Sequence, residues 1–385
     1  MKTKDKLAQY IATTRRTKPA PLATYYEQLF DLLRCLSPGD AFPRLHTTYS
    51  VQRRCEVISL DDEVFLVYDQ YLGQTINTLN RVFFASPQNT AEAALMYACK
   101  YLAENLRVRQ RDRLALFFAR GYHSLRERVH LPPTSANQLQ TTLVMLQEVY
   151  VISHEIFHYL CKCDDKMRTS SLRRAVIAFE ACASGGLKPE AVQSHAERYG
   201  TSMNSDDLRQ TADTDFEQWR TYMDRYSEEV ASDFHAAESV CDFAARYTNI
   251  DFRYIPPALV LVYRHLRFLR LLDEFLADLL KEPRRSCVPD ASEMRAHLLR
   301  WVLEDTPIGD PSAAIWDDLY GEMQEMHARY NELIEANVFH TLSSWMPTPR
   351  KIENEAPSTP TEKLGRAVDH LTGWLPWTED AAATE

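Results

Sequence analysis

The chain has 385 residues, of which 45% are hydrophobic and 25% charged, and its formal net charge is −10. This length allows one large or two medium domains with a sizeable core, and the acidic balance argues against general nucleic-acid binding. Only 10 glycines occur, and no glycine-rich phosphate-binding motif is present, so nucleotide chemistry has no motif to support it.

Hydrophobic periodicity gives the elements of the first third of the chain. A first helix is predicted over residues 22–36, and residues 47–68 are predicted to form a β-hairpin with Asp61 and Asp62 in its turn. This hairpin is expected either to offer an edge strand to a substrate backbone or only to cap a helical core. Further helices are predicted over residues 70–84, 90–108 and 111–128.

The most informative stretch is residues 153–158, which read Ser-His-Glu-Ile-Phe-His inside a long predicted helix that Thr134 or Ser135 can cap. His154 and His158 lie one turn apart on one face, so their imidazoles can share a Zn²⁺ ion. Glu155 follows the first histidine, and its carboxylate can take a proton from water activated by that ion. The alternative is a pair of histidines that face solvent, which the apolar residues around the motif disfavour.

A third zinc ligand is expected downstream, where Glu229 and Asp233 lie four residues apart on one helix face. Glu229 can bind the metal, and Asp233 can accept the ring N–H of a ligand histidine. Glu238 and Asp242 repeat the same spacing and compete for this role. Glu229 is preferred because small residues surround it and allow two helices to approach closely.

The combination of H-E-x-x-H at residues 154–158 and E-x-x-S-D at residues 229–233 resembles the gluzincin zinc metallopeptidases, the group that includes thermolysin. The resemblance implies that His154, His158 and Glu229 bind zinc, that Glu155 is the general base and that Asp233 supports the first histidine. It covers two short patches, and Glu229 lies 71 residues beyond His158. A faint similarity to phage-exclusion and other defence-associated bacterial metallopeptidases rests on architecture alone.

The remainder of the chain is also predicted to be largely helical. Residues 164–170 are predicted to be a loop, residues 200–215 a polar lid near the site, and residues 283–289 a linker. The tail from residue 347 is rich in Pro, Ser, Thr and Glu and contains a short amphipathic piece, which either folds back or docks on a partner. The predicted helices span residues 171–183, 189–199, 216–247, 258–281, 291–304, 312–343 and 362–373.

The sequence also gives expectations about domains and compartment. The predicted regions are an N-terminal helical region with the hairpin, a metallopeptidase core, a C-terminal helical region and a tail, spanning residues 1–133, 134–282, 283–346 and 347–385. No secretory signal is seen, and charged residues interrupt the apolar stretch 255–280, so we expect a cytoplasmic protein without a membrane span. The eight cysteines are expected to be reduced. Cys161 is interpreted as a buried apolar residue, with a thiolate ligand as the alternative.

Together these features predict a mainly α fold with a zincin-like core and one small β-hairpin or sheet. The leading hypothesis is a zinc-dependent endopeptidase that acts on one or a few proteins or peptides. No nucleic-acid partner is expected, whereas a regulatory protein partner is compatible with this hypothesis. The alternatives are a non-proteolytic zinc-stabilised protein and a metal-free helical interaction module. The candidates for a donor to the transition state are Tyr222, Tyr226, His235 and His265.

Overall fold

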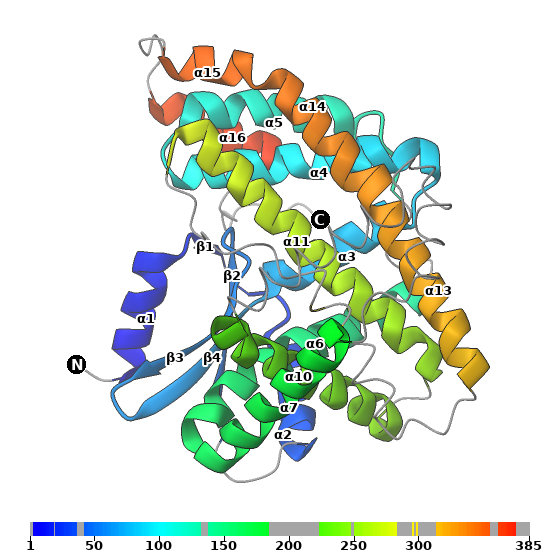
Figure 1. The fold of residues 1–385 in the computed structure, drawn as a ribbon. Helices are drawn as coiled ribbons and strands as arrows, with labels where there is room; N and C mark the ends of the chain where they lie inside the picture. Colours follow the sequence, from blue (N-terminus) through cyan, green and yellow to red (C-terminus); the bar gives the residue numbers. More distant parts are fainter. Residues whose placement is uncertain are drawn as a thin grey trace.

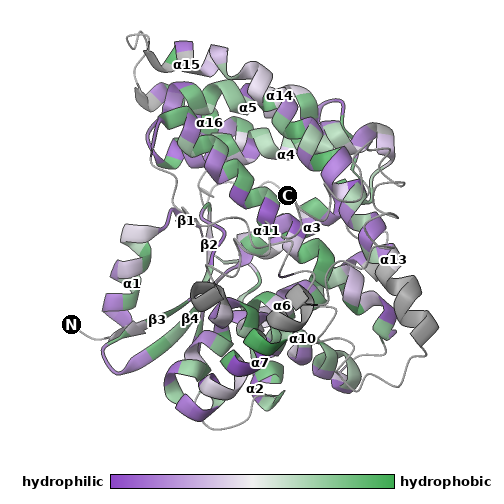
Figure 2. Ribbon diagram, viewed as in Figure 1, coloured by the Kyte–Doolittle hydropathy of each residue, from purple (hydrophilic) through white to green (hydrophobic). Residues whose placement is uncertain are grey.

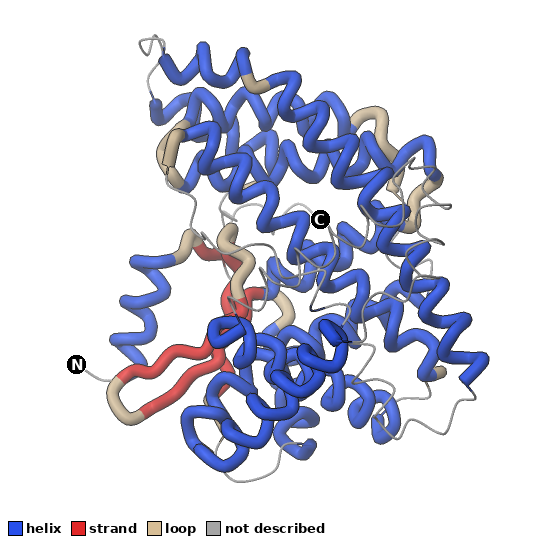
Figure 3. The backbone as a smooth tube through the Cα atoms, viewed as in Figure 1, coloured by secondary structure: helices blue, strands red, loops and turns tan. Residues whose placement is uncertain are grey.

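The protein is mostly helical with one small sheet, as the sequence predicts (Figures 1 and 3). These features come from a computed structural model. It describes residues 3–18, 20–36, 42–131, 138–184, 223–247, 250–282, 295, 298, 313–354 and 361–374. The sheet has the strand order β1-β2-β4-β3. Its strands are β1 (Thr17–Lys18), β2 (Arg44–Ser50), β3 (Cys55–Leu60) and β4 (Glu63–Asp69).

The predicted hairpin is present as the antiparallel pair β3 and β4, and β3 is the edge strand. The predicted start of the hairpin at residue 47 is wrong, because residues 47–54 form the end of β2 and a loop. Asp61, in its turn, has a left-handed backbone with φ of 53°. Strand β2, which pairs with β4 in parallel, was not foreseen. Its sequence, Arg-Leu-His-Thr-Thr-Tyr-Ser, lacks the alternation of apolar and polar residues that identifies a strand.

Strand β4 is covered on both faces. Phe65 and Val67 pack with Leu7 and Ile11 of helix α1 (Thr3–Thr14). Leu66 and Tyr68 instead belong to the main core. A register shift of one residue would exchange the two faces, so these contacts fix the position of the sheet.

Twelve further α-helices occur within the described ranges, the sheet lies at one side of the molecule, and α11 runs diagonally across it (Figure 1). Most helices carry both hydrophobic and hydrophilic residues, as expected for elements with one buried side (Figure 2). None of the described helices is both long and apolar enough to cross a bilayer. The helices are α2 (Ala23–Leu36), α3 (Gln70–Phe83), α4 (Pro87–Val108), α5 (Asp112–Arg126), α6 (Gln138–Cys163), α7 (Asp165–Ser184), α10 (Met223–Tyr247), α11 (Ile255–Leu280), α13 (Ala313–Tyr330), α14 (Asn337–Trp345), α15 (Pro347–Asn354) and α16 (Thr361–Thr372).

The prediction of a loop over residues 164–170 is wrong, because α7 begins at Asp165. The side chain of Asp164 accepts hydrogen bonds from the backbone N–H groups of Lys166 and Met167, at 2.9 and 3.0 Å, and so caps the helix. The polar residues that suggested a loop lie mostly on the exposed side of this helix.

The amphipathic piece that was predicted in the tail forms helix α16. Helix α16 folds back and packs against α4 and α5, and a further helix, α15, occupies part of the stretch expected to be irregular. One cluster of buried apolar side chains includes residues from Tyr26 to Val368. The predicted domain boundaries stay a prediction. Several predicted features lie outside the described residues. They are the helix 189–199, the lid 200–215, the linker 283–289, the capping residues Thr134 and Ser135, and most of the helix 291–304.

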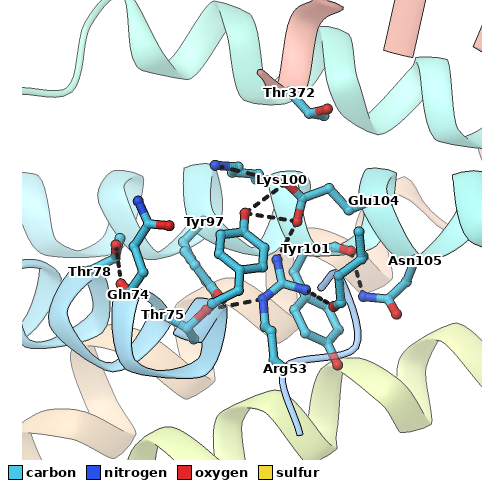
Figure 4. A network of polar contacts seen from close by, with 12 residues as sticks. Arg53, Gln74, Thr75, Thr78, Tyr97, Lys100, Tyr101, Glu104, Asn105 and Thr372 are labelled. Carbon is cyan, nitrogen blue, oxygen red and sulfur yellow. Dashed lines mark hydrogen bonds and ion pairs between the residues drawn. The ribbon is translucent and has the colours of Figure 1, made fainter. Parts of the chain in front are cut away.

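A buried ion pair joins the sheet to the helices (Figure 4). Arg53, in the loop between β2 and β3, pairs with Glu104 of α4, and both side chains are 1% exposed. The guanidinium also donates to the hydroxyl of Thr75 on α3 at 3.0 Å and lies 4.3 Å from the centre of the Tyr71 ring. Because both charges are paired and surrounded by further partners, their burial is compensated. The pair anchors the β2–β3 loop, and with it the position of the edge strand.

Candidate metal centre

Helices α6 and α10 pack against each other and carry the two motifs. The small residues of α10 that favoured Glu229 are buried, so the two backbones approach closely. These residues are Ala231, Ser232, Ala236 and Ala237. The predicted reason for the close approach of the two helices therefore agrees with their packing.

The side chains of His154, His158 and Glu229 converge between these helices. Nε2 of His154 lies 3.3 Å from Nε2 of His158 and 3.4 Å from Oε2 of Glu229, and Nε2 of His158 lies 3.6 Å from Oε1 of Glu229. Four ligands about 2.0–2.1 Å from a tetrahedral zinc ion lie about 3.3–3.4 Å from each other. The spacing therefore fits three ligands of one ion. Within the described ranges this is the only group of three such side chains that can hold a metal.

The competing pair, Glu238 and Asp242, points elsewhere. Glu238 forms an ion pair with Arg174 of α7, and Asp242 is exposed. The structure thus brings Glu229, and not Glu238, to the two histidines.

Asp233 is buried behind His154. Its Oδ1 lies 3.0 Å from Nδ1 of His154 and accepts a hydrogen bond from the hydroxyl of Tyr150 at 2.5 Å. Arg295 donates to both carboxylate oxygens, at 2.6 and 2.7 Å. Burial alone would raise the pKa of Asp233, but Arg295 and His154 outweigh it and hold the pKa well below its usual range. Asp233 is therefore an anion that orients the ring of His154.

His158 has its own supporting contacts. Its Nδ1 lies 3.2 Å from Oε1 of Glu228 and 3.5 Å from the hydroxyl oxygen of Ser232. Each histidine thus presents Nε2 to the centre while Nδ1 faces an oxygen acceptor from α10. This arrangement selects one tautomer for a metal-binding imidazole.

The charges of these side chains depend on one another. Burial lowers the pKa of His154, but contacts with Asp233 and Glu229 overcome this and raise it to about 9. Burial would raise the pKa of Glu229, but His154 and Arg295 lower it to about 2. These directions favour a positive charge on His154 and a negative charge on Glu229, so a cation at this group would compete with a proton of His154.

Glu155 lies beside the ligands without belonging to the group of three. Its carboxylate accepts a hydrogen bond from the backbone N–H of Val57, on edge strand β3, and burial raises its pKa to about 7. This value already includes the charge of His154, which lowers the pKa, and that of Glu229, which raises it. A carboxylate with a pKa near neutrality suits a general base.

The four candidate donors fall in different places. Tyr222 and the side chain of Tyr226 lie outside the described residues. His235 stacks on Phe157, with ring centres 4.9 Å apart. Both ring nitrogens of His265 are engaged in the core, with Asn80 and Tyr330 at 2.8 and 3.0 Å. Cys161 is buried in the core, in line with its interpretation as an apolar residue.

Sequence reasoning missed four residues of the site. Tyr150 lies one turn before His154 on α6, and that spacing was a signal that could have identified it. Tyr263 hydrogen-bonds to Tyr150 at 2.5 Å, Glu228 immediately precedes Glu229, and Arg295 joins from far along the chain. No local pattern marks Tyr263 or Arg295.

Three comparisons with known proteins give no further indication. No protein-family model, no curated protein and no solved structure matches the chain.

Proposed function

We propose that this protein is a zinc-dependent endopeptidase acting on one or a few protein or peptide substrates in the cytoplasm. The observation that carries the proposal is the convergence of His154, His158 and Glu229, with Glu155 beside them and Asp233 behind His154. Two histidines and a carboxylate are a common ligand set of catalytic zinc and leave one position open. A bound Zn²⁺ ion supplies a Lewis acid that polarises a carbonyl group and activates water.

The side chains of the protein take the remaining tasks. Glu155, beside the three side chains and contacted by the Val57 N–H, accepts the proton of the attacking water and can pass it to the leaving amine. Asp233, whose Oδ1 lies 3.0 Å from Nδ1 of His154, favours a proton on Nδ1, so that Nε2 keeps its lone pair for the metal. Arg295 keeps Asp233 ionised and in place.

The edge strand supports a peptide as the substrate class. Strand β3 pairs with β4 on one side only, and its Val57 N–H contacts Glu155. An extended peptide that pairs with this edge would place a backbone carbonyl close to the candidate base. In this arrangement β3 would bind the backbone of the substrate, while α6 supplies the candidate base Glu155.

The test is elemental analysis of the full chain purified without chelator, followed by digestion of a diverse peptide library. About one zinc ion per chain and cleavage that stops on chelation and returns with zinc are expected. Protein without bound zinc that also fails to bind added zinc would refute the proposal.

A second candidate is a metal-free interaction module, favoured by one observation. Arg295 pairs with Asp233 and lies 3.6 Å from Glu229, so the cluster is largely charge-balanced without a cation. In that case the histidines are part of a buried ion-pair network. The same zinc titration separates the two functions, since an ion-pair network binds zinc weakly or not at all.

A further inference from the structure

A cavity of about 960 Å³ lies between α2, α3 and α6, away from the candidate metal centre. Leu22 and Tyr25, which are 53% and 39% exposed, stand at its mouth, and Glu148 of α6, which is 3% exposed, lies at its inner end. No residue of the candidate metal centre lines it. Glu148 and Glu155 lie two turns apart on one face of α6, about 10 Å along the helix.

Glu148 is a buried carboxyl group without a countercharge. Its Oε1 accepts hydrogen bonds from the hydroxyls of Tyr26 and Tyr68 at 2.6 and 3.1 Å, and its Oε2 accepts one from Tyr25 at 3.2 Å. No lysine, arginine or histidine in the described part of the chain pairs with it. A carboxylate has room for about four hydrogen bonds, so Oε2 retains capacity for a further donor.

The side chains that line the cavity offer a ligand further contacts besides the carboxyl group of Glu148. The rings of Tyr25, Tyr26 and Tyr49 line it together with apolar side chains of α6, and aromatic rings attract cations through their faces. Gln70, 3% exposed, also lines the cavity, and its Nε2 has no hydrogen-bond partner within the described residues. The cavity therefore offers a carboxyl group that an ammonium ion can pair with in its ionised form, aromatic faces and one free amide donor.

The absence of a side chain at Gly73 makes room for the carboxyl group of Glu148. A Cβ atom at Gly73 would lie 1.9 Å from Oε1 of Glu148 and 2.8 Å from the hydroxyl of Tyr26. Only glycine at this point of α3 leaves room for the carboxyl group. Among the described residues that line the cavity, the one lysine is Lys18, which contacts the carbonyl oxygen of Gly373 at 3.2 Å and the ring of Trp374 at 4.6 Å.

We infer that this cavity is a second binding site, for a small molecule with a protonated amine on an apolar body and a hydrogen-bond acceptor. The ammonium group donates to Glu148 and lies among the tyrosine rings, and the acceptor takes the amide N–H of Gln70. A lysine side chain of another protein carries the same ammonium group, and the experiment separates the two sources.

The test uses the full-length protein and a panel of fragment-sized amines, each paired with the alcohol of the same carbon skeleton, such as 2-phenylethylamine with 2-phenylethanol. Binding is measured by ligand-observed NMR and calorimetry, and Nα-acetyl-lysine amide represents a protein lysine. We expect amines to bind about 10- to 100-fold more tightly than their alcohols, the affinity equivalent of a charge-assisted hydrogen bond. Binding of the lysine derivative more tightly than every other amine in the panel would instead assign the site to a lysine side chain and overturn the small-molecule assignment.

Variants locate the site. Glu148→Gln should remove the preference for amines and keep the zinc content of the wild type, whereas Glu27→Gln, which removes the same charge from an exposed position of α2, should change neither. Val144→Phe, which fills the cavity from α6 without altering Glu148, should abolish binding even if the Glu148 variant does not fold. Equal binding of amines and alcohols, an unchanged preference in Glu148→Gln, or no binding by any amine overturns the inference. None of these outcomes depends on whether the protein is a peptidase.

Discussion

Arg295 holds Asp233 with two hydrogen bonds, at 2.6 and 2.7 Å, and Asp233 in turn touches His154. The Asp233 side chain is 3% exposed, so its charge depends on the two positive groups beside it, of which Arg295 has the larger effect and His154 the smaller. Removal of one partner of a buried ion pair leaves the other uncompensated.

Arg295→Ala is therefore expected to lower the free energy of unfolding by about 3–5 kcal/mol, and Arg295→Lys by less, because it keeps the charge but not the two-pronged geometry. Urea denaturation measures both. Arg44→Ala is the control, since Arg44 pairs with Glu63 at the surface, where the loss should be at most about 1 kcal/mol. Equal effects of Arg295→Ala and Arg44→Ala would show that Asp233 does not need the guanidinium.

The third ligand can be tested by two matched substitutions. Glu229→Gln removes a carboxylate that lies 3.4 and 3.6 Å from the two histidines, and Glu238→Gln removes one that pairs with Arg174. Zinc occupancy after dialysis should fall strongly in the first variant and stay at the wild-type level in the second. The reverse result would assign the ligand to Glu238 and contradict the observed orientation of α10.

Substitution of Glu155 distinguishes a catalytic role of this side chain from a structural one. Glu155→Gln keeps the size of the side chain and its hydrogen bond from Val57, but it removes the base. We expect unchanged zinc content and melting temperature, with peptide cleavage reduced by about two to four orders of magnitude. His154→Ala should lose both zinc and activity, because it removes a ligand. Full cleavage by zinc-loaded Glu155→Gln would exclude this carboxylate as the base.

Local patterns account for most of the fold that was predicted. Helices α2, α3, α4, α5 and α11 begin and end within a few residues of their predicted limits, because each has an apolar stripe and a proline, glycine or polar break. Strand β2 could not be predicted in this way, since it owes its place to pairing with β4. The start of α7 was missed because an exposed polar helix and a loop have similar compositions.

Some residues of the candidate site could likewise be predicted from local spacing in the sequence, and others could not. His154, Glu155 and His158 follow from spacing within one helix, and Glu229 and Asp233 from spacing within another. Arg295 lies 62 residues beyond Asp233 and has no motif around it, so only the folded structure brings it to the carboxylate. The cavity around Glu148 was also invisible, because its residues come from segments that are distant in the sequence.

Gly73 and Gly321 should respond oppositely to the same substitution. Both lie in helices, where alanine normally stabilises relative to glycine by up to about 1 kcal/mol. Gly321→Ala should show this gain, because no atom lies within 4 Å of the added Cβ. Gly73→Ala should destabilise, because its Cβ would meet the carboxyl oxygen of Glu148 at 1.9 Å. Thermal denaturation in parallel measures both, and stabilisation by Gly73→Ala would show that Glu148 lies elsewhere.

Glu148 should make stability depend on pH in a direction that is unusual for a carboxyl group. Burial raises its pKa from 4.5 to about 7, against the opposing hydrogen bonds of three tyrosines. Between these two values the folded protein binds more protons at this group than the unfolded chain does. Stability contributed by Glu148 is therefore fully present below pH 4.5 and is lost as the pH rises to about 7.

The variant Glu148→Gln removes this titration and leaves all others in place, so its difference from the wild type isolates the group. We expect the free energy of unfolding of the variant to gain on that of the wild type by up to about 3 kcal/mol as the pH rises from about 4.5 to above 7. Urea denaturation at intervals across this range gives the difference directly. Glu27→Gln, with an exposed carboxyl group on α2, should run parallel to the wild type. A Glu148→Gln curve that is also parallel would mean that the carboxyl group is solvated, or paired with a cation, in the folded protein.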